Sequence, residues 1–250
     1  MYEQIKAVLF DLDGTVYYGN QMIEKADRVV ERFREIGKRV YCMTNNSTKS
    51  RQQICEKLAG MGLMFQKEQI YTSGYAAALY ARERGYKSVY VFGTESLKEE
   101  FEELGIKASE AAEVVVVGYD MEFNYQKLRD ALQAALQADT IIACNKEKYY
   151  PGEGAKRMPG CGAMVGALEG SLGRTADYVI GKPNPLLLDV ICTQQKLRKE
   201  EILVVGDTYE SDIQMAQDYG CQSIYIGKTT EETLGSIKKV NHIKEILEWL

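Results

Sequence analysis

The chain has 250 residues, enough for one large domain or two modest ones with a substantial core. Hydrophobic residues make up 45% of it, charged residues 27%, and the formal net charge is -5, so nothing indicates a surface for polyanions such as nucleic acid. No apolar run approaches the roughly 20 residues of a membrane helix. The N-terminal stretch "MYEQIKAVLFDLDG" lacks the basic start and cleavage site of a signal peptide, so we expect a cytoplasmic protein without nucleic-acid or membrane partners.

The cysteines and the single histidine narrow the chemistry. Six cysteines are scattered without a C-x-x-C pair, which is typical of reduced thiols rather than of disulfides or a zinc site. The only histidine, His242, lies in "NHIKEILEWL", where apolar residues recur at helical spacing, and we interpret it as a helix-start or surface residue. Catalytic triads and zinc sites built on several histidines are therefore excluded.

In chain order, short apolar runs alternate with amphipathic helical patterns. The first pairs are "KAVLFD" with "KADRVVERFREIG" and "KRVYCMTNN" with "SRQQICEKLAGMG". The tail repeats the scheme in "EILVVGD", "ESDIQMAQDYG", "CQSIYIG" and a closing helix. This alternation predicts an α/β fold with right-handed βαβ units around a doubly wound, mostly parallel sheet, and such sheets bind ligands at the carboxyl ends of their strands.

The middle of the chain carries the same alternation again, in "SVYVFG", "ESLKEEFEELG", "EVVVVG", "NYQKLRDALQAALQ" and "DTIIAC". It is long enough for a second α/β unit of about 100 residues. The stretch "YYPGEGAKRMPGCG" holds two of the four prolines and is the longest loop signal.

Polar residues stand where strand-like runs end. They are Asp11 and Asp13 after "AVLF", Thr44 to Ser47 after "VYCM", Lys182 in "VIGKPNP", and Asp207 with Asp212 in "LVVGDTYESD". Because the carboxyl ends of parallel strands share one edge of the sheet, we expect these residues to converge.

Four acids crowded together repel one another, and a hard divalent cation with oxygen ligands is the simplest way to keep most of them ionised. Mg²⁺ suits the set, because it commonly shares its coordination shell with a phosphate. The acids that the cation would hold ionised are among Asp11, Asp13, Asp207 and Asp212. The predicted phosphate ligands are Lys182, Thr44, Asn45, Asn46 and nearby backbone N–H groups, including that of Leu12. The implied substrate is a phosphoryl group.

The two N-terminal aspartates are predicted to have different roles. No serine–base pair is evident, so we expect a carboxylate nucleophile, and Asp11 is nearest the rigid strand. Asp13, two residues on, then acts as the general acid and base, protonating the leaving group and later activating water. Gly14 allows a sharp turn after the strand, and Thr15 is expected to fix that turn with its side chain.

The motifs resemble those of a known family. "DLDGT", "TNNS", "GKPNP" and "GDTYESDI" occur in the order and spacing of the haloacid dehalogenase (HAD) superfamily, and "TNNST", "TSG", "YPGEG" and "PGCGAM" resemble its NagD-like, para-nitrophenylphosphatase branch. The resemblance covers nearly the whole chain. It implies a HAD-like, Rossmann-like core of residues 1–77 and 181–250 with an inserted α/β cap at 78–180. The oligomeric state stays open, although similar proteins often form a homodimer through the cap.

The resemblance also implies site roles: Asp11 as nucleophile, Asp13 as acid and base, Thr44 and Lys182 on the phosphate, and Mg²⁺ on Asp11, the Asp13 carbonyl and Asp207, with Asp212 direct or through water. The chain departs from the branch in the cap, where Asn145-Lys146-Glu147 replaces the usual Asn-x-Asp. We therefore expect a Mg²⁺-dependent phosphatase of a small phosphorylated metabolite, whose substrate is chosen by contacts around 145–150 and 159–164.

Several alternatives stay open at this stage. Sugar phosphates, nucleotides, glycerol phosphate and pyridoxal phosphate all fit the motifs. A phospho-accepting regulatory module, or a phosphotransferase, phosphonatase or dehalogenase on the same fold, is the competing hypothesis. For Tyr17 and Tyr18 the pattern favours packing at a domain interface over substrate contact, and Glu210 is interpreted as a solvated helix-start residue.

Overall fold

The computed structural model describes residues 3–151, 156–228 and 237–250. The chain divides into two compact units: a core unit of residues 1–44, 51–71 and 182–250, and a cap unit of residues 45–50 and 72–181. The expected domain boundaries, with a cap at 78–180, stay a prediction. Within the described part of the chain, no helix combines the length and apolarity needed to cross a membrane.

The core unit is built on a six-stranded sheet with the order β15-β14-β13-β1-β4-β5. Its strands are β1 (Ala7–Asp11), β4 (Arg39–Thr44), β5 (Ile70–Thr72), β13 (Ile202–Gly206), β14 (Gln222–Ile226) and β15 (Lys238–Val240). The pairings of β1 with β4 and β13, and of β14 with β13 and β15, are parallel. The strand order reverses between β1 and β13, and a ligand site is expected at such a reversal.

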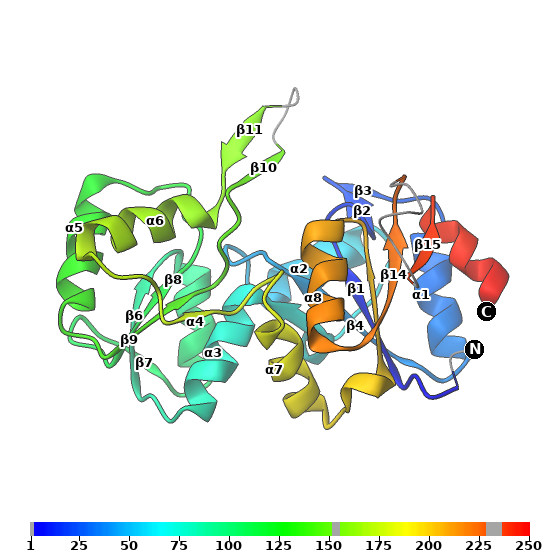
Figure 1. Cartoon of the computed structure of the whole chain (residues 1–250), viewed down its shortest axis with the longest axis horizontal. Helices are drawn as coiled ribbons and strands as arrows, with labels where there is room; N and C mark the ends of the chain where they lie inside the picture. The colour runs from blue at the N-terminus through cyan, green and yellow to red at the C-terminus, as the bar shows by residue number, and fades with distance from the viewer. Residues whose placement is uncertain (1–2, 152–155, 229–236) are drawn as a thin grey trace. The chain divides into compact units, whose positions relative to one another are not determined.

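Helices and turns connect these strands: α1 (Ala26–Glu35), α2 (Arg51–Gly60), η1 (Lys67–Gln69), α7 (Leu186–Gln195), η3 (Lys199–Glu201), η4 (Tyr209–Ile213), α8 (Gln214–Tyr219) and η6 (Ile243–Trp249). In Figure 1, α1 and α8 lie on opposite sides of the core strands, as a doubly wound sheet requires. A small hairpin, β2 (Tyr17–Tyr18) with β3 (Gln21–Met22), follows β1.

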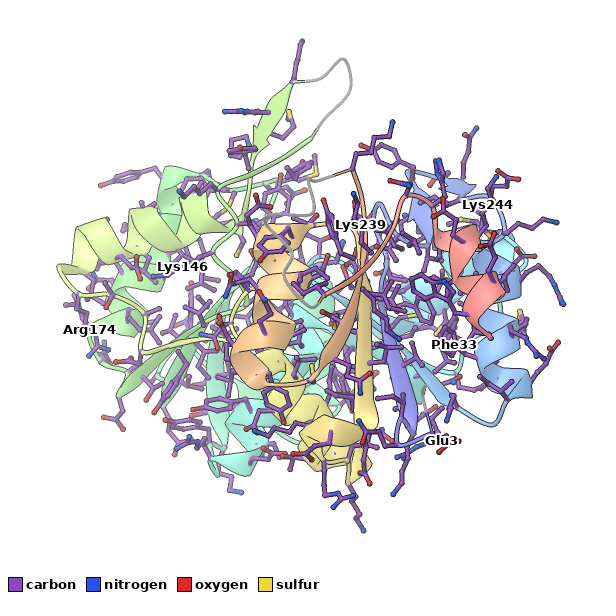
Figure 2. The ribbon with its side chains drawn as sticks, turned by 45° about the vertical axis from the view of Figure 1, so that its right-hand side comes forward. Glu3, Phe33, Lys146, Arg174, Lys239 and Lys244 are labelled. Carbon is purple, nitrogen blue, oxygen red and sulfur yellow. The ribbon has the colours of Figure 1, made fainter. Side chains whose placement is uncertain are left out.

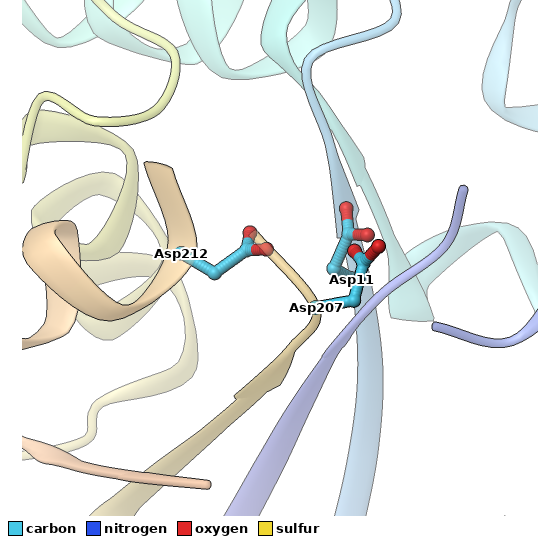
Figure 3. Close-up of side chains that lie close together, drawn as sticks. All are labelled: Asp11, Asp207 and Asp212. Carbon is cyan, nitrogen blue, oxygen red and sulfur yellow. The ribbon is translucent and has the colours of Figure 1, made fainter. Parts of the chain in front are cut away.

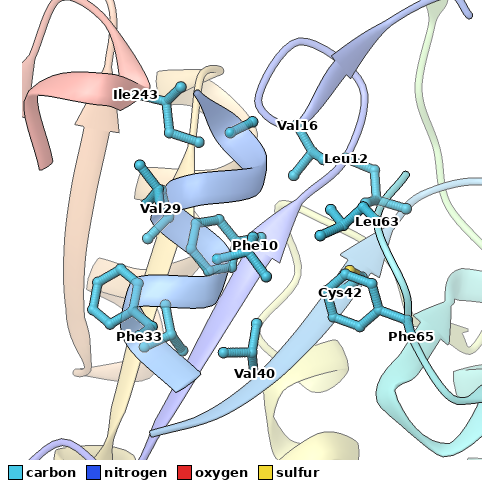
Figure 4. Close-up of a cluster of buried hydrophobic side chains, with 14 of the residues drawn as sticks. Phe10, Leu12, Val16, Val29, Phe33, Val40, Cys42, Leu63, Phe65 and Ile243 are labelled. Carbon is cyan, nitrogen blue, oxygen red and sulfur yellow. The ribbon is translucent and has the colours of Figure 1, made fainter. Parts of the chain in front are cut away.

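The hydrophobic core of this unit explains why α1 forms where it does. Val29, Val30 and Phe33 are fully buried and recur at helical spacing, so they turn one face of α1 toward the sheet. The ring of Phe33 meets Phe10 of β1 edge-on, with 5.8 Å between the ring centroids. Ile243 of η6 closes the same cluster (Figure 4).

The cap unit contains a second, five-stranded sheet with the order β12-β9-β8-β6-β7 and parallel pairings throughout. Its elements are α3 (Ser73–Glu83), β6 (Ser88–Phe92), α4 (Glu95–Glu102), β7 (Lys107–Ala108), β8 (Val114–Val117), α5 (Tyr125–Ala135), β9 (Thr140–Ala143), β10 (Tyr149–Pro151), β11 (Arg157–Pro159), α6 (Cys161–Leu172) and β12 (Tyr178–Val179). Small residues of α5 and apolar residues of α6 pack on β8 and β9. The predicted α/β class is therefore confirmed in both units.

Two stretches differ from the expectation. The predicted loop at 149–162 contains an antiparallel hairpin, in which β10 pairs with β11, and it ends in the first turn of α6. This stretch contains two prolines and several glycines and shows no alternation of apolar and polar residues. The sequence therefore did not predict the hairpin. Gly152, Glu153 and Gly154 of "YPGEG" lie outside the described residues.

The surface and the thiols agree with the sequence. The labelled charged residues Glu3, Lys146, Arg174 and Lys244 are exposed, whereas Phe33 is buried (Figure 2). His242 is exposed and stands at the start of η6, as predicted. All six cysteines are free thiols, and five of them are buried.

Candidate active site

The register of the core sheet brings the predicted acids together. Phe10 of β1 pairs with Val205 of β13, so Asp11, the last residue of β1, lies level with the end of β13 and its successor Asp207. On the other side Asp11 pairs with Met43, which places Thr44 one residue further along β4. The convergence at one edge of the sheet is therefore a consequence of parallel pairing.

Lys182 connects two of these acids. Its Nζ lies 2.5 Å from Oδ1 of Asp11 and 2.6 Å from Oδ1 of Asp212, and all three side chains are nearly excluded from solvent. Burial alone would lower the pKa of the Lys182 ammonium, but the charges of Asp11 and Asp212 outweigh burial and hold its pKa above the ordinary value. Lys182 is therefore a fixed positive charge inside the cluster.

The Asp11 carboxylate is costly to keep charged. Burial raises its pKa well above the ordinary value, and the charges of Asp212 and Asp207 add to this rise, whereas Lys182 opposes it. The pKa of Asp207 is also raised, first by burial and then by Asp212. Without a bound cation, the state in which all carboxylates of the cluster are ionised is therefore disfavoured.

The turn after β1 is shaped around Asp207. Gly14 has a φ of +93°, which side chains rarely tolerate, and a Cβ there would lie 2.7 Å from Cγ of Asp207. The buried Thr15 hydroxyl donates to Oδ1 of Asp207 over 3.3 Å. We expected the Thr15 side chain to fix its own turn. Its hydroxyl instead holds the carboxylate of Asp207, one of the predicted metal ligands.

Asp212 is turned back toward β13 by a π-helical turn, η4. Its backbone N–H donates to the carbonyl of Thr208, and its Oδ2 accepts from the Thr208 N–H over 3.1 Å. Gly206 leaves room for this return, since a Cβ at Gly206 would collide with the Asp212 side chain. Single π-helical turns are often found at functional sites. Glu210, in the same turn, is exposed, as expected.

The three carboxylates form a set that suits a hard cation. Asp11, Asp207 and Asp212 each offer an oxygen within 4.8 Å of the others, and two of the three residues are buried (Figure 3). Lys182 supplies one positive charge against three carboxylates. An all-oxygen set with excess negative charge is what Mg²⁺ prefers.

Asp13, two residues after Asp11, is exposed. It sits in a tight turn whose backbone converges on the carbonyl of Leu12, and the Leu12 side chain is fully buried. The phenol of Tyr17 donates to Oδ2 of Asp13 over 3.2 Å. Tyr17 is buried in the hydrophobic cluster of the core unit, whereas Tyr18 is largely exposed, and packing of either at a domain interface stays a prediction.

The predicted phosphate ligands are divided between the two units. Thr44 is buried at the end of β4 in the core unit, while Asn45 and Asn46 belong to the cap unit. The carboxamide oxygen of Asn46 accepts from the backbone N–H groups of Thr48 and Lys49, which makes it part of a local turn.

Asn45 is held by the Asn145–Glu147 stretch of the cap unit, where the chain differs from the Asn-x-Asp that is usual in the branch. Its Nδ2 donates to Oε1 of Glu147 over 3.0 Å, and its carbonyl accepts from Nδ2 of Asn145 over 2.8 Å. Gly160 and Gly162 permit this arrangement, because a Cβ at either position would press on the Glu147 carbonyl. The sequence singled out the Asn145–Glu147 stretch as a substrate contact but gave no sign that it supports Asn45.

Comparisons with known proteins agree with the motifs. A model of the haloacid dehalogenase-like hydrolase family matches residues 8–107, and a model described as HAD-hydrolase-like matches residues 179–248. Sugar-phosphatase AraL of Bacillus subtilis (strain 168) is 33% identical over 253 residues, which cover 95% of this chain and 93% of that protein. Acid sugar phosphatase of Staphylococcus aureus (strain USA300) is 34% identical over 242 residues, covering 96% and 92%.

Solved structures extend the likeness to three dimensions. The p-nitrophenyl phosphatase from Archaeoglobus fulgidus is 30% identical and superposes with a TM-score of 0.89, over 98% of this chain and 99% of that one. Sequence and structure thus agree over almost the full length. The chain belongs to the haloacid dehalogenase-like hydrolases, in their NagD-like, para-nitrophenylphosphatase branch.

Proposed function

We propose that this protein is a Mg²⁺-dependent phosphatase that hydrolyses a small phosphomonoester through an aspartyl-phosphate on Asp11. The observation that carries the proposal is the buried cluster in which Lys182 bonds both Asp11 and Asp212. Burying these charged side chains lowers the stability of the folded chain. Such a cluster is expected where a protein has to hold a phosphoryl group between an ammonium and a bound cation.

The first half of the reaction transfers the phosphoryl group to the protein. A carboxylate oxygen of Asp11 attacks phosphorus, and the bond from phosphorus to the ester oxygen breaks. Asp13 gives its proton to that oxygen, so the leaving group departs as an alcohol. Lys182 keeps Asp11 oriented and balances charge on the phosphoryl oxygens, with Thr44, Asn45 and the backbone near Leu12 as further donors.

The second half releases phosphate. Asp13, now a carboxylate, takes a proton from water as the water oxygen attacks phosphorus, and the bond from phosphorus to Asp11 breaks. Asp11 returns as a carboxylate and Asp13 returns protonated. Asp11, Asp207, Asp212 and the Asp13 carbonyl are the proposed Mg²⁺ ligands, and the cation supplies charge neutralisation for the phosphoryl oxygens.

The substrate class is proposed from the relatives. Two similar proteins are named sugar phosphatases, and one similar structure is a p-nitrophenyl phosphatase. We therefore propose a sugar phosphate or a comparable phosphorylated metabolite, selected by the cap unit. The unusual glutamate of the cap, Glu147, is engaged with Asn45, so the remaining selective contacts are expected from its neighbours.

The test is hydrolysis of p-nitrophenyl phosphate with Mg²⁺, repeated with a chelator and with Asp11→Asn. Asp218→Asn is the matched control, because Asp218 is an exposed acid of the core unit whose carboxylate accepts a hydrogen bond from Gln214 over 2.8 Å. We expect activity in the wild type and the control only, and no activity with the chelator. Full activity of Asp11→Asn would overturn the nucleophile assignment.

The competing functions have distinct outcomes in the same assay. A phospho-accepting regulatory module would label Asp11 without turnover. A dehalogenase or phosphonatase would release halide from a haloacid or phosphate from a phosphonate while leaving p-nitrophenyl phosphate intact. An acid placed two residues after Asp11 favours the phosphatase, because halide displacement has little use for a proton donor.

A further inference from the structure

The hydroxyl of Tyr17 is placed on the carboxyl group of Asp13. It donates to Oδ2 over 3.2 Å, and the Tyr17 side chain is 1% exposed although Asp13 itself is exposed. The Tyr17 ring is thus buried, while its hydroxyl oxygen contacts the carboxyl group of Asp13, the proposed acid and base. Buried tyrosines normally find a partner for the hydroxyl, and here the partner is a reacting group.

The turn that carries Asp13 does not depend on this hydroxyl. The Leu12 carbonyl accepts from the N–H groups of Thr15, Val16 and Tyr17, and the Gly14 N–H donates to the Tyr17 carbonyl over 2.8 Å. These backbone bonds close the turn without any side chain. The phenol is therefore an additional constraint, and it acts on the rotation of the carboxyl group rather than on the path of the chain.

The Tyr17 ring is itself fixed from α2. The Lys57 ammonium lies 3.6 Å from the ring centroid, over the face of the ring. A cation at this position attracts the electron-rich face and strengthens the phenol as a donor. Burial, followed by the charge of Asp13, raises the pKa of Tyr17 above its ordinary value, so the phenol keeps its proton.

We propose that Tyr17 is a positioning residue that orients the Asp13 carboxyl group for proton transfer to the leaving group. This inference rests on the proposed function. With a donor on Oδ2, the transferable proton of Asp13 resides on Oδ1. That proton moves to the ester oxygen as the bond to phosphorus breaks, and Tyr17 keeps its own proton throughout.

The dependence on the leaving group separates this role from packing. An alkyl phosphate needs a proton on its leaving oxygen, whereas p-nitrophenolate leaves well without one. We expect Tyr17→Phe to lower kcat/KM on the order of tenfold for glycerol phosphate, used as the alkyl probe, and far less for p-nitrophenyl phosphate. Lys57→Met should show the same pattern more weakly, and the matched control Tyr18→Phe should not show it.

A double-mutant cycle tests whether Tyr17 acts through Asp13. Asp13→Asn alone should cause a larger fall with the same dependence on the leaving group, and adding Tyr17→Phe to it should cost nothing further. Equal losses of Tyr17→Phe on both substrates, no loss on either, or additive losses with Asp13→Asn would overturn the inference and leave the phosphatase intact. Wild-type kinetics of Asp13→Asn on glycerol phosphate would overturn the acid assignment and the inference with it.

Discussion

The Lys182→Met variant tests the electrostatics of the buried cluster. Methionine keeps much of the side-chain volume and removes the charge. The Nζ atom lies 2.5 Å from Asp11 and 2.6 Å from Asp212, and the three side chains are at most 6% exposed. Removing one partner of a buried ion pair and leaving the other charged costs about 3–5 kcal/mol. For a chain of this size that loss lowers the melting temperature by roughly 6–20 °C.

The assay can be restricted to the core unit. Trp249, the only tryptophan, lies in η6 of that unit, so its fluorescence follows unfolding there. Urea unfolding in a chelator should show the full loss for Lys182→Met. Added Mg²⁺ should recover part of it, and more than it adds to the wild type, because the cation replaces the lost positive charge.

The control is the same substitution at an exposed ion pair of the same unit. Lys244 lies 2.9 Å from Glu24, with both side chains exposed, and Lys244→Met should cost less than about 1 kcal/mol. If Lys182→Met loses no more stability than Lys244→Met, the cluster is not an uncompensated set of buried charges and the reasoning fails.

Two further predictions concern the turn and the acid limb of stability. Gly14→Ala should lower the free energy of unfolding by about 1–3 kcal/mol and abolish most activity, because alanine is strained at this positive φ and its Cβ would displace Asp207. The control is Gly19→Ala, at a positive φ with open space around it. In urea unfolding and turnover assays, this control should lose stability but keep its activity. Hydrogen bonds from the Lys6 side chain and from the backbone and side chain of Arg198 lower the pKa of Glu201 from 4.5 to about 2. The stabilisation that ionised Glu201 contributes is therefore present above pH 4.5 and is lost as the pH falls toward 2. Glu201→Gln should therefore flatten the decline of the urea midpoint over that window, and an unchanged decline would contradict the assignment.

Much of the site could be predicted because it follows from parallel pairing. Asp11, Thr44 and Asp207 end strands of the core sheet or follow them directly, and parallel pairing brings them to one edge. Lys182 was expected to follow a strand of the same sheet, but the strand before it, β12, belongs to the second sheet, so its contact with Asp11 does not follow from this pairing. Asp212 was predictable from its spacing after Asp207, although the π-helical turn that returns it to the site was not. The motif order then supported the family, which the comparisons confirmed.

The contacts that support these residues could not be read from the sequence. Thr15 bonds Asp207 across 192 positions of the chain, and no local pattern encodes such a partner. Tyr17 shows the same limit, because a buried tyrosine is expected to pack and the partner of its hydroxyl, Asp13, is set by the folded turn. Asn45 as a phosphate ligand stays a prediction, and its hydrogen bonds to Asn145 and Glu147, about 100 positions away, could not be foreseen either. A homodimer through the cap stays a prediction.

The most direct test of the central claim is acid quenching during turnover of p-nitrophenyl phosphate with Mg²⁺, followed by mass analysis of the peptide that contains Asp11. The account predicts that this peptide carries one phosphoryl group during turnover and that Asp11→Asn carries none. Steady turnover with an unmodified Asp11 peptide, or a phosphoryl group on a different residue, would contradict it.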